Sequence, residues 1–151
     1  MIALDTNILV HAHRRGTSHH EPALALLASL AGGPAPYALF WPSLYEFLRV
    51  VTHHRVFDPP STTGEALEAI QDFLTPPVAQ VLSETDRHRV LLERVIQESR
   101  VTGNLIHDAH LVALAIEHGV HEILTLDGDF AKSMNDLGEF PMGLLVTPAI
   151  G

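Results

Sequence analysis

Four acidic residues stand in separate segments of the chain, where their carboxylates can converge on a divalent metal: Asp5, Glu46, Asp108 and Asp127. Magnesium prefers hard oxygen ligands in near-octahedral geometry. When bound beside a phosphodiester, such an ion lowers the pKa of a water and steadies the charge on the phosphate. Carboxylates clustered without a metal repel one another and raise one another's pKa. The set therefore predicts a divalent-metal site suited to phosphodiester hydrolysis.

Asp5 and Asp127 each follow an apolar segment that we expect to be a β-strand, at residues 2–4 and 122–126. In open α/β sheets, ligands bind beyond the carboxyl ends of the strands. If both strands belong to one parallel sheet, the two carboxylates reach the same edge. The alternative is that each aspartate caps a helix or occupies a turn.

Asp108 lies between Leu105 and Val112 on the apolar stripe of an expected helix. An ionised carboxylate on a core-facing stripe is costly unless a partner or a metal compensates its charge, so the alternative is a buried salt bridge. Glu46 lies in another expected helix, where an ion pair with Arg49, three residues later, explains it equally well. Glu46 becomes informative only together with the other acids.

Apolar periodicity and turn residues predict strands that alternate with helices, which indicates an α/β domain with a mostly parallel sheet. With 151 residues the chain fits one domain, residues 1–151. Strands are expected at residues 2–4, 37–40, 78–82, 122–126 and 144–146. Helices are expected at residues 20–30, 43–54, 62–74, from a capping box at 83–86 to about 101, and at 104–118.

Composition narrows the class of protein. The chain is 46% hydrophobic and has no cysteine, which excludes a disulfide framework and any cysteine-ligated metal site. No signal peptide and no long apolar stretch is visible, so we expect a cytoplasmic protein without a membrane partner. The net charge of -9 is opposite to that of most nucleic-acid-binding proteins. A metal bound at an acidic site inverts the local charge, however, so nucleic acid stays a possible substrate.

Other enzyme classes have weaker support. No glycine-rich phosphate loop and no serine nucleophile elbow is present. Asp5 fits the position of a phosphoaspartyl nucleophile, but Asn7 stands where such enzymes have a second aspartate. A receiver domain needs a lysine at the end of a late strand, and Lys132, the one lysine, does not follow a strand.

Four motifs together resemble the PIN-domain family and, within it, the VapC-type toxins of toxin–antitoxin systems. They occur in the family's order and span nearly the whole chain. The motifs are IALDTNIL at residues 2–9, SLYEF at 43–47, LIHDAHLVA at 105–113 and ILTLDGDF at 123–130. The resemblance implies a three-layer α/β/α domain with a central five-stranded sheet. It also implies that Asp5, Glu46 and Asp108 are the core catalytic metal ligands, with Asp127 as the fourth.

The resemblance also implies roles for neighbouring residues. Thr6 would hold the loop of Asp5, and Asn7 would support the site by hydrogen bonds. Asp129 is a possible substitute or supporting acid beside Asp127. Basic residues that follow Asp5 or Glu46 are the expected RNA contacts, with ordinary solvated surface charge as the alternative for each. They are Arg14, Arg15 and Arg49, and with less support His11, His53, His54 and Arg55.

Membership of this family implies an endoribonuclease that uses Mg²⁺, with Mn²⁺ as a possible substitute. VapC-type members form homodimers and are neutralised by a small antitoxin of the VapB type. Apolar residues of the first two expected helices are candidates for the surface that the antitoxin covers. Three alternatives stay open at this stage. They are a PIN-type nuclease of RNA processing, a DNA-directed metal nuclease, and an inactive PIN-like interaction module.

Overall fold

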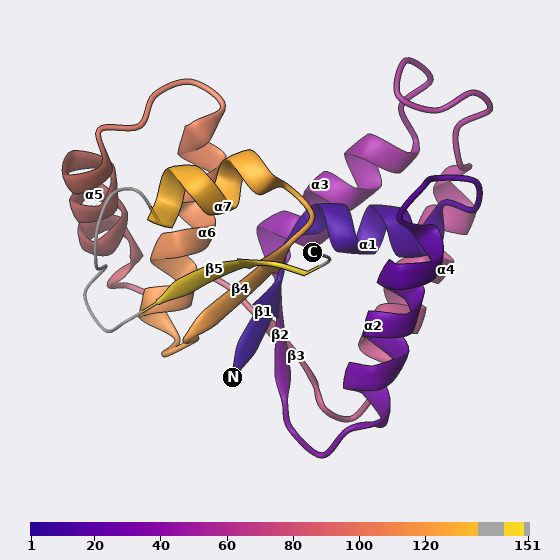
Figure 1. Ribbon diagram of the computed structural model, residues 1–151, viewed down its shortest axis with the longest axis horizontal. Helices are drawn as coiled ribbons and strands as arrows, with labels where there is room; N and C mark the ends of the chain where they lie inside the picture. The colour runs from indigo at the N-terminus through magenta and orange to yellow at the C-terminus, as the bar shows by residue number, and fades with distance from the viewer. Residues whose placement is uncertain (136–143, 150–151) are drawn as a thin grey trace.

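A five-stranded parallel sheet forms the centre of the computed structural model, which describes residues 1–135 and 144–149 (Figure 1). The strand order is β3-β2-β1-β4-β5, and every neighbouring pair is parallel. The strands are β1 (Ile2–Leu4), β2 (Tyr37–Phe40), β3 (Ala79–Leu82), β4 (Glu122–Thr125) and β5 (Leu145–Pro148). In the register, Leu4 of β1 lies beside Leu39 of β2 and Leu124 of β4. The expected α/β fold is confirmed, with all strands parallel.

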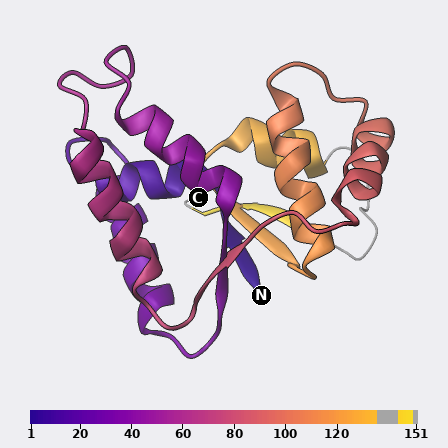
Figure 2. The same ribbon diagram turned by 180° about the vertical axis from the view of Figure 1, so that it is seen from behind.

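Helices cover both faces of the sheet, with α1–α4 on one side and α5–α7 on the other (Figure 1 and Figure 2). They are α1 (Thr6–His13), α2 (His20–Gly32), α3 (Trp41–Val51), α4 (Thr63–Leu74), α5 (His88–Ser99), α6 (Leu105–Glu117) and α7 (Gly128–Asn135). None of these helices is both long enough and apolar enough to cross a lipid bilayer.

Strand β2 illustrates how the sequence leads to a sheet with a layer of helices on each face. All four of its residues are buried, as expected for a strand covered on both faces. Ala38 and Phe40 belong to the apolar cluster that includes residues of α5, α6 and α7. Tyr37 and Leu39 point the other way, into the cluster with residues of α1 to α4. The alternation of side chains along each strand therefore supplies two cores.

The structure differs from the sequence prediction in two helices that were not predicted and in where two predicted helices begin. Helix α3 starts at Trp41 and ends at Val51, where residues 43–54 were expected. Helix α1 was not predicted, because five of its eight residues are buried and no single apolar stripe stands out. Helix α7 was also not predicted, and its first turn is held by Asp127. The predicted capping box at residues 83–86 is wrong. The hydroxyl of Ser83 donates to the side chain of Glu84 instead of capping a helix, and α5 begins only at His88, without a side-chain cap.

Candidate metal centre

The four acidic residues singled out by the sequence line one pocket. This inner pocket, of about 220 Å³, lies beyond the carboxyl ends of β1 and β4, between α1, α3 and α6. Glu46, Asp108 and Asp127 also line a wider outer cavity of about 770 Å³, so the pocket opens outward through them. The structure thus brings together carboxylates from a strand end, two helices and a second strand end.

Asp5 is the most buried of the four, with 7% of its surface exposed. It caps α1, since Oδ1 accepts a hydrogen bond of 2.7 Å from the backbone N–H of Thr6. Its Oδ2 accepts another of 2.7 Å from the hydroxyl of Thr125. Burial raises the pKa of Asp5, and the two hydrogen bonds oppose that rise. The capping role and a metal-binding role are compatible, because each carboxylate oxygen keeps a lone pair.

Thr125, the last residue of β4, organises this part of the pocket from a fully buried position. Its hydroxyl donates to Asp5 and accepts hydrogen bonds from the side chain of Asn7 and the backbone N–H of Asp127. The side-chain oxygen of Asn7 in turn accepts from the backbone N–H of Leu126 at 3.0 Å. The supporting hydrogen bonds expected of Asn7 are therefore present. Sequence reasoning missed Thr125, whose only signal is its position at the end of a strand.

Asp127 is exposed and holds the start of α7. Its Oδ1 accepts hydrogen bonds from the backbone N–H groups of Asp129 and Phe130, at 2.9 and 3.1 Å. The Asp129 side chain is exposed and is not among the residues that line the inner pocket or the outer cavity. Of the two acids in this segment, the structure brings Asp127 to the pocket.

Asp108 is half-buried in the first turn of α6. Among the described residues it forms no hydrogen bond through its carboxylate, whereas Asp5, Glu46 and Asp127 all do. Burial, followed by the negative charge of Asp5, raises the pKa of Asp108 to about 6. No arginine forms the salt bridge that was the alternative explanation for this residue, within the part of the chain described. Within the described residues this carboxylate therefore has no direct hydrogen-bond or salt-bridge partner, although the charge of His107 opposes the rise of its pKa.

Glu46 is held by three neighbours. Its Oε1 lies 3.3 Å from Arg49, the ion pair expected from the sequence. Its Oε2 lies 2.6 Å from Nε2 of His107 and accepts a hydrogen bond of 3.3 Å from the hydroxyl of Thr6. The contact with His107 lowers the pKa of Glu46 and raises that of His107. Sequence reasoning missed His107, although it directly precedes Asp108.

Thr6 lies at the inner pocket, whereas the three predicted arginines line other cavities. Thr6 bridges the Asp5 segment to α3, through Glu46 and the backbone carbonyl of Ser43. Arg49 lines the outer cavity. Arg14 and Arg15 line a different cavity, where Arg14 hydrogen-bonds Ser61 and Pro59. The structure therefore places one of the three predicted arginines at the outer cavity, beside Glu46.

The residues present fit a hard divalent cation. The inner pocket offers carboxylate oxygens from four segments and no thiol, which is the donor set that Mg²⁺ and Mn²⁺ prefer. The raised pKa of Asp5 and of Asp108 reflects burial of negative charge that a cation would neutralise. The types and arrangement of these residues therefore suit a divalent metal beside an open cavity.

Comparison with known proteins identifies the family. A family model described as PIN domain matches residues 2–133. The chain belongs to the PIN-domain family. Ribonuclease VapC48 of Mycobacterium tuberculosis is 36% identical over 128 residues, which cover 85% of this chain and 88% of that protein. Ribonuclease VapC37 of the same species is 32% identical over 145 residues, covering 96% and 100%. The expected family of VapC-type ribonuclease toxins, and with it the enzyme class, is confirmed.

Solved structures agree on the fold. VapC20 of Mycobacterium tuberculosis, described as a sarcin-ricin loop cleaving toxin, matches with a TM-score of 0.65 and 20% identity. The match covers 88% of this chain and 95% of that chain. VapBC2 from Rickettsia felis, solved with a DNA fragment from its promoter, has a TM-score of 0.65 and 18% identity, with 98% of each chain covered. The three-layer PIN architecture expected from the sequence is thereby confirmed.

Proposed function

We propose that residues 1–151 form a single PIN-like domain that acts as a Mg²⁺-dependent endoribonuclease, the toxin of a toxin–antitoxin pair. One observation carries the catalytic part of the proposal, namely the convergence of Asp5, Glu46, Asp108 and Asp127 on one pocket. Asp5 and Asp108 would hold a first ion, and Glu46 and Asp127 would complete its shell or position a second ion.

A divalent ion bound here supplies a water of lowered pKa and stabilises negative charge on the scissile phosphate. The residues of the chain do the positioning. Thr125 and the Thr6 backbone fix both oxygens of Asp5, which leaves that carboxylate little freedom. Arg49 and His107 likewise contact the two oxygens of Glu46. Asp108, without such partners, is the carboxylate with the most to gain from a cation.

The outer cavity supports a nucleic-acid substrate despite the overall acidic charge. Arg49 on its wall is 58% exposed in its side chain and can contact a phosphate. Tyr45 on the same wall is 67% exposed and offers a face on which an unpaired base can stack. A single-stranded or looped RNA segment therefore fits this entrance better than a rigid duplex does.

The test is cleavage of a panel of labelled RNA and DNA strands with Mg²⁺, Mn²⁺ or EDTA. The parent protein is compared with Asp108→Asn and with Asp72→Asn, which changes an exposed carboxylate on α4. We expect metal-dependent cutting of RNA by the parent and by Asp72→Asn, and loss of cutting by Asp108→Asn. Preference for DNA, or no cutting by a folded, partner-free protein, would overturn the ribonuclease proposal.

The surface beside the entrance supports binding of an antitoxin. An apolar groove of about 350 Å³ runs between α3 and α4, lined by Tyr45, Leu48 and Leu67 among others. Leu67 is 58% exposed, and Trp41, at the start of α3, is 51% exposed. A segment of a VapB-like antitoxin laid in this groove would also cover the outer cavity, because Tyr45 and Arg49 line both. We propose further that the free toxin is a homodimer.

The antitoxin proposal is tested by co-expression of the chain with its cognate antitoxin. Leu67→Asp should weaken co-purification of the pair, because it places a charge in the apolar groove. Glu68→Gln, at the next position on the exposed surface of α4, is the matched control and should bind normally. Equal binding by Leu67→Asp would remove the groove from the interface. Light scattering of the isolated chain measures whether it is a dimer.

A further inference from the structure

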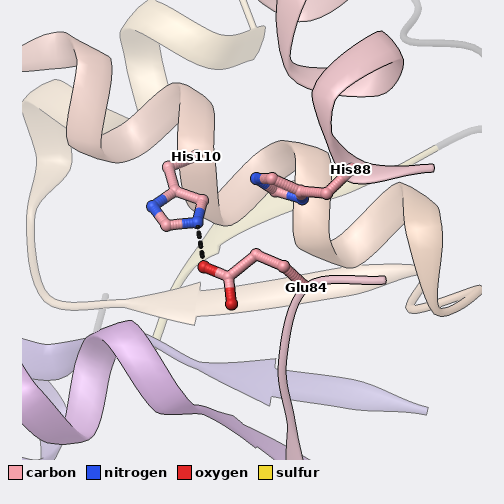
Figure 3. A group of neighbouring side chains, drawn as sticks. All are labelled: Glu84, His88 and His110. Atoms are coloured by element: carbon pink, nitrogen blue, oxygen red, sulfur yellow. Dashed lines mark hydrogen bonds and ion pairs between the residues drawn. The ribbon is translucent and has the colours of Figure 1, made fainter. Parts of the chain in front are cut away.

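A second group of side chains of types that can bind a metal lies on another part of α6. It is separate from the inner pocket that the four carboxylates line, which is called the acidic pocket below. Glu84 from the β3–α5 loop, His88 from the start of α5 and His110 from α6 converge there (Figure 3). One ligand atom of each residue lies within 4.8 Å of the others. None of the three lines the inner pocket or the outer cavity.

His88 is the buried centre of this group, with 9% of its surface exposed. Its Nδ1 lies 2.9 Å from Oε2 of Glu117, whose side chain is fully buried. This carboxylate favours the tautomer that carries its hydrogen on Nδ1, so that Nε2 presents a lone pair. Nε2 is buried and has no hydrogen-bond partner among the described residues. An imidazole oriented by a carboxylate in this way is the arrangement that metal-binding histidines usually have.

Glu84 and His110 complete the group from its more open side. Nε2 of His110 lies 2.8 Å from Oε1 of Glu84 (Figure 3). The two imidazole rings are 4.8 Å apart between centroids. A metal ion can replace the hydrogen between His110 and Glu84 once the ring hydrogen moves to Nδ1 of His110. Tetrahedral Zn²⁺ with bonds of about 2.1 Å requires ligand atoms roughly 3.4 Å apart, so side-chain rotations on binding must shorten separations that lie within 4.8 Å here.

We propose that Glu84, His88 and His110 form a zinc-class transition-metal site, with Glu117 as the carboxylate that orients His88. Two imidazoles and one carboxylate are ligands for Zn²⁺ and similar ions, whereas Mg²⁺ prefers oxygen ligands. Three protein ligands leave the fourth tetrahedral position to water. Such an ion would tie the β3–α5 loop and the start of α5 to α6, the helix that also carries Asp108. Zinc would thus bind the folded chain and stabilise it.

The test is zinc binding by the folded chain in excess Mg²⁺, which competes for the acidic pocket. Equilibrium dialysis with metal analysis gives the stoichiometry, and Co²⁺ in place of Zn²⁺ gives the visible absorption typical of tetrahedral coordination. Glu84→Gln and His110→Gln change partly exposed ligands and should fold normally. His54→Gln, an exposed histidine far along the sequence from the group, is the matched control. Asp108→Asn reports on zinc bound at the acidic pocket.

We expect one zinc ion per chain in the parent, in His54→Gln and in Asp108→Asn, with a higher melting temperature when zinc is present. His110→Gln and Glu84→Gln should each lower the affinity at least about 10-fold, and Co²⁺ absorption should be lost in His110→Gln. Equal zinc affinity in the parent and both ligand variants would overturn the proposal. So would loss of the bound zinc in Asp108→Asn, which would place the ion at the acidic pocket and leave the nuclease proposal intact.

Discussion

Two groups of ionisable side chains lie on different sides of α6 and differ in both donor chemistry and support. The acidic pocket collects carboxylates from four segments, and Asp108 is its contribution from α6. The second group has two imidazoles and one carboxylate, and its contribution from α6 is His110. Residues two apart on a helix point in directions roughly 160° different. One helix therefore serves two sites that should prefer different metals.

The two sites also differ in what holds them in place. In the acidic pocket, Thr125 and the Thr6 backbone restrain Asp5, while Asp108 forms no hydrogen bond among the described residues. In the second group, one buried carboxylate, Glu117, fixes the buried histidine. The comparison indicates that an oxygen-only site depends on accumulated negative charge, whereas the histidine site depends on an oriented lone pair.

The largest expected effect comes from neutralising the carboxylate with no hydrogen-bond partner. Asp108→Asn should lower kcat/KM for RNA by roughly 1000-fold, since metal stabilisation of the reacting phosphate is worth several kcal/mol. Its stability without metal should rise by about 1 kcal/mol or less at neutral pH, because the cost of burying this charge and its repulsion by Asp5 are removed at a half-exposed position. Single-turnover cleavage and thermal unfolding measure the two effects. Loss of activity through unfolding would contradict this account.

A smaller effect is expected from Thr125→Val, which removes the hydroxyl that positions Asp5. Affinity for Mg²⁺ should fall about 10- to 100-fold, as is typical when a residue that supports a metal ligand is lost. The unfolding free energy should fall by about 1–3 kcal/mol, because buried partners are left unsatisfied. Thr125→Ser keeps the hydroxyl and should restore metal affinity. If Thr125→Val and Thr125→Ser bind Mg²⁺ alike, the hydroxyl does not position the site.

The pKa of about 6 at Asp108 predicts two opposite pH effects. Metal binding should weaken as pH falls through about 6, because protons compete for this carboxylate. In EDTA the unfolding free energy should instead fall as pH rises toward 6, because the folded state binds this proton more tightly than the unfolded state. Subtracting the pH profile of Asp108→Asn from that of the parent separates the titration of Asp108 from that of the Glu46–His107 pair. Identical profiles for parent and variant would contradict the assigned environment of Asp108.

The smallest effect on stability is expected at the cavity entrance. Arg49→Gln removes an exposed ion pair with Glu46 and should change the unfolding free energy by less than about 1 kcal/mol. RNA binding should weaken. The slope of the logarithm of the binding constant against the logarithm of the salt concentration should become shallower by about one, which corresponds to one lost phosphate contact. Arg89→Gln, an exposed ion-paired arginine on α5, is the matched control. Equal salt dependence in all three proteins would exclude Arg49 from contact with phosphate.

The carboxylates that follow strands could be predicted from the sequence, but the residues that contact the site carboxylates could not. Asp5 and Asp127 could be assigned to one sheet edge because parallel strands end together. Asp108 stood out because a charge on an apolar stripe needs an explanation. His107 and Thr125 gave no comparable signal, because their roles depend on contacts with Glu46 and Asp5, which are remote in sequence.

The histidine group was equally hidden, for a related reason. His88 and His110 are 22 positions apart, and only the packing of α5 against α6 places their rings together. The capping-box prediction for residues 83–86 also concealed it, because it treated this segment as part of a helix, whereas Thr85 there donates to Glu117 on α6. Sequence patterns thus predicted which acidic residues lie at strand ends but not the contacts between helices.

A crystal structure of the protein soaked in Mn²⁺, with anomalous scattering to locate the ion, tests directly whether the inner pocket is the metal centre. We predict an anomalous peak in the inner pocket, within about 2.5 Å of carboxylate oxygens of Asp5 and Asp108. The peak should be absent from crystals of Asp108→Asn. An ion bound elsewhere, or an unchanged peak in the variant, would contradict the assignment of this pocket as the metal centre.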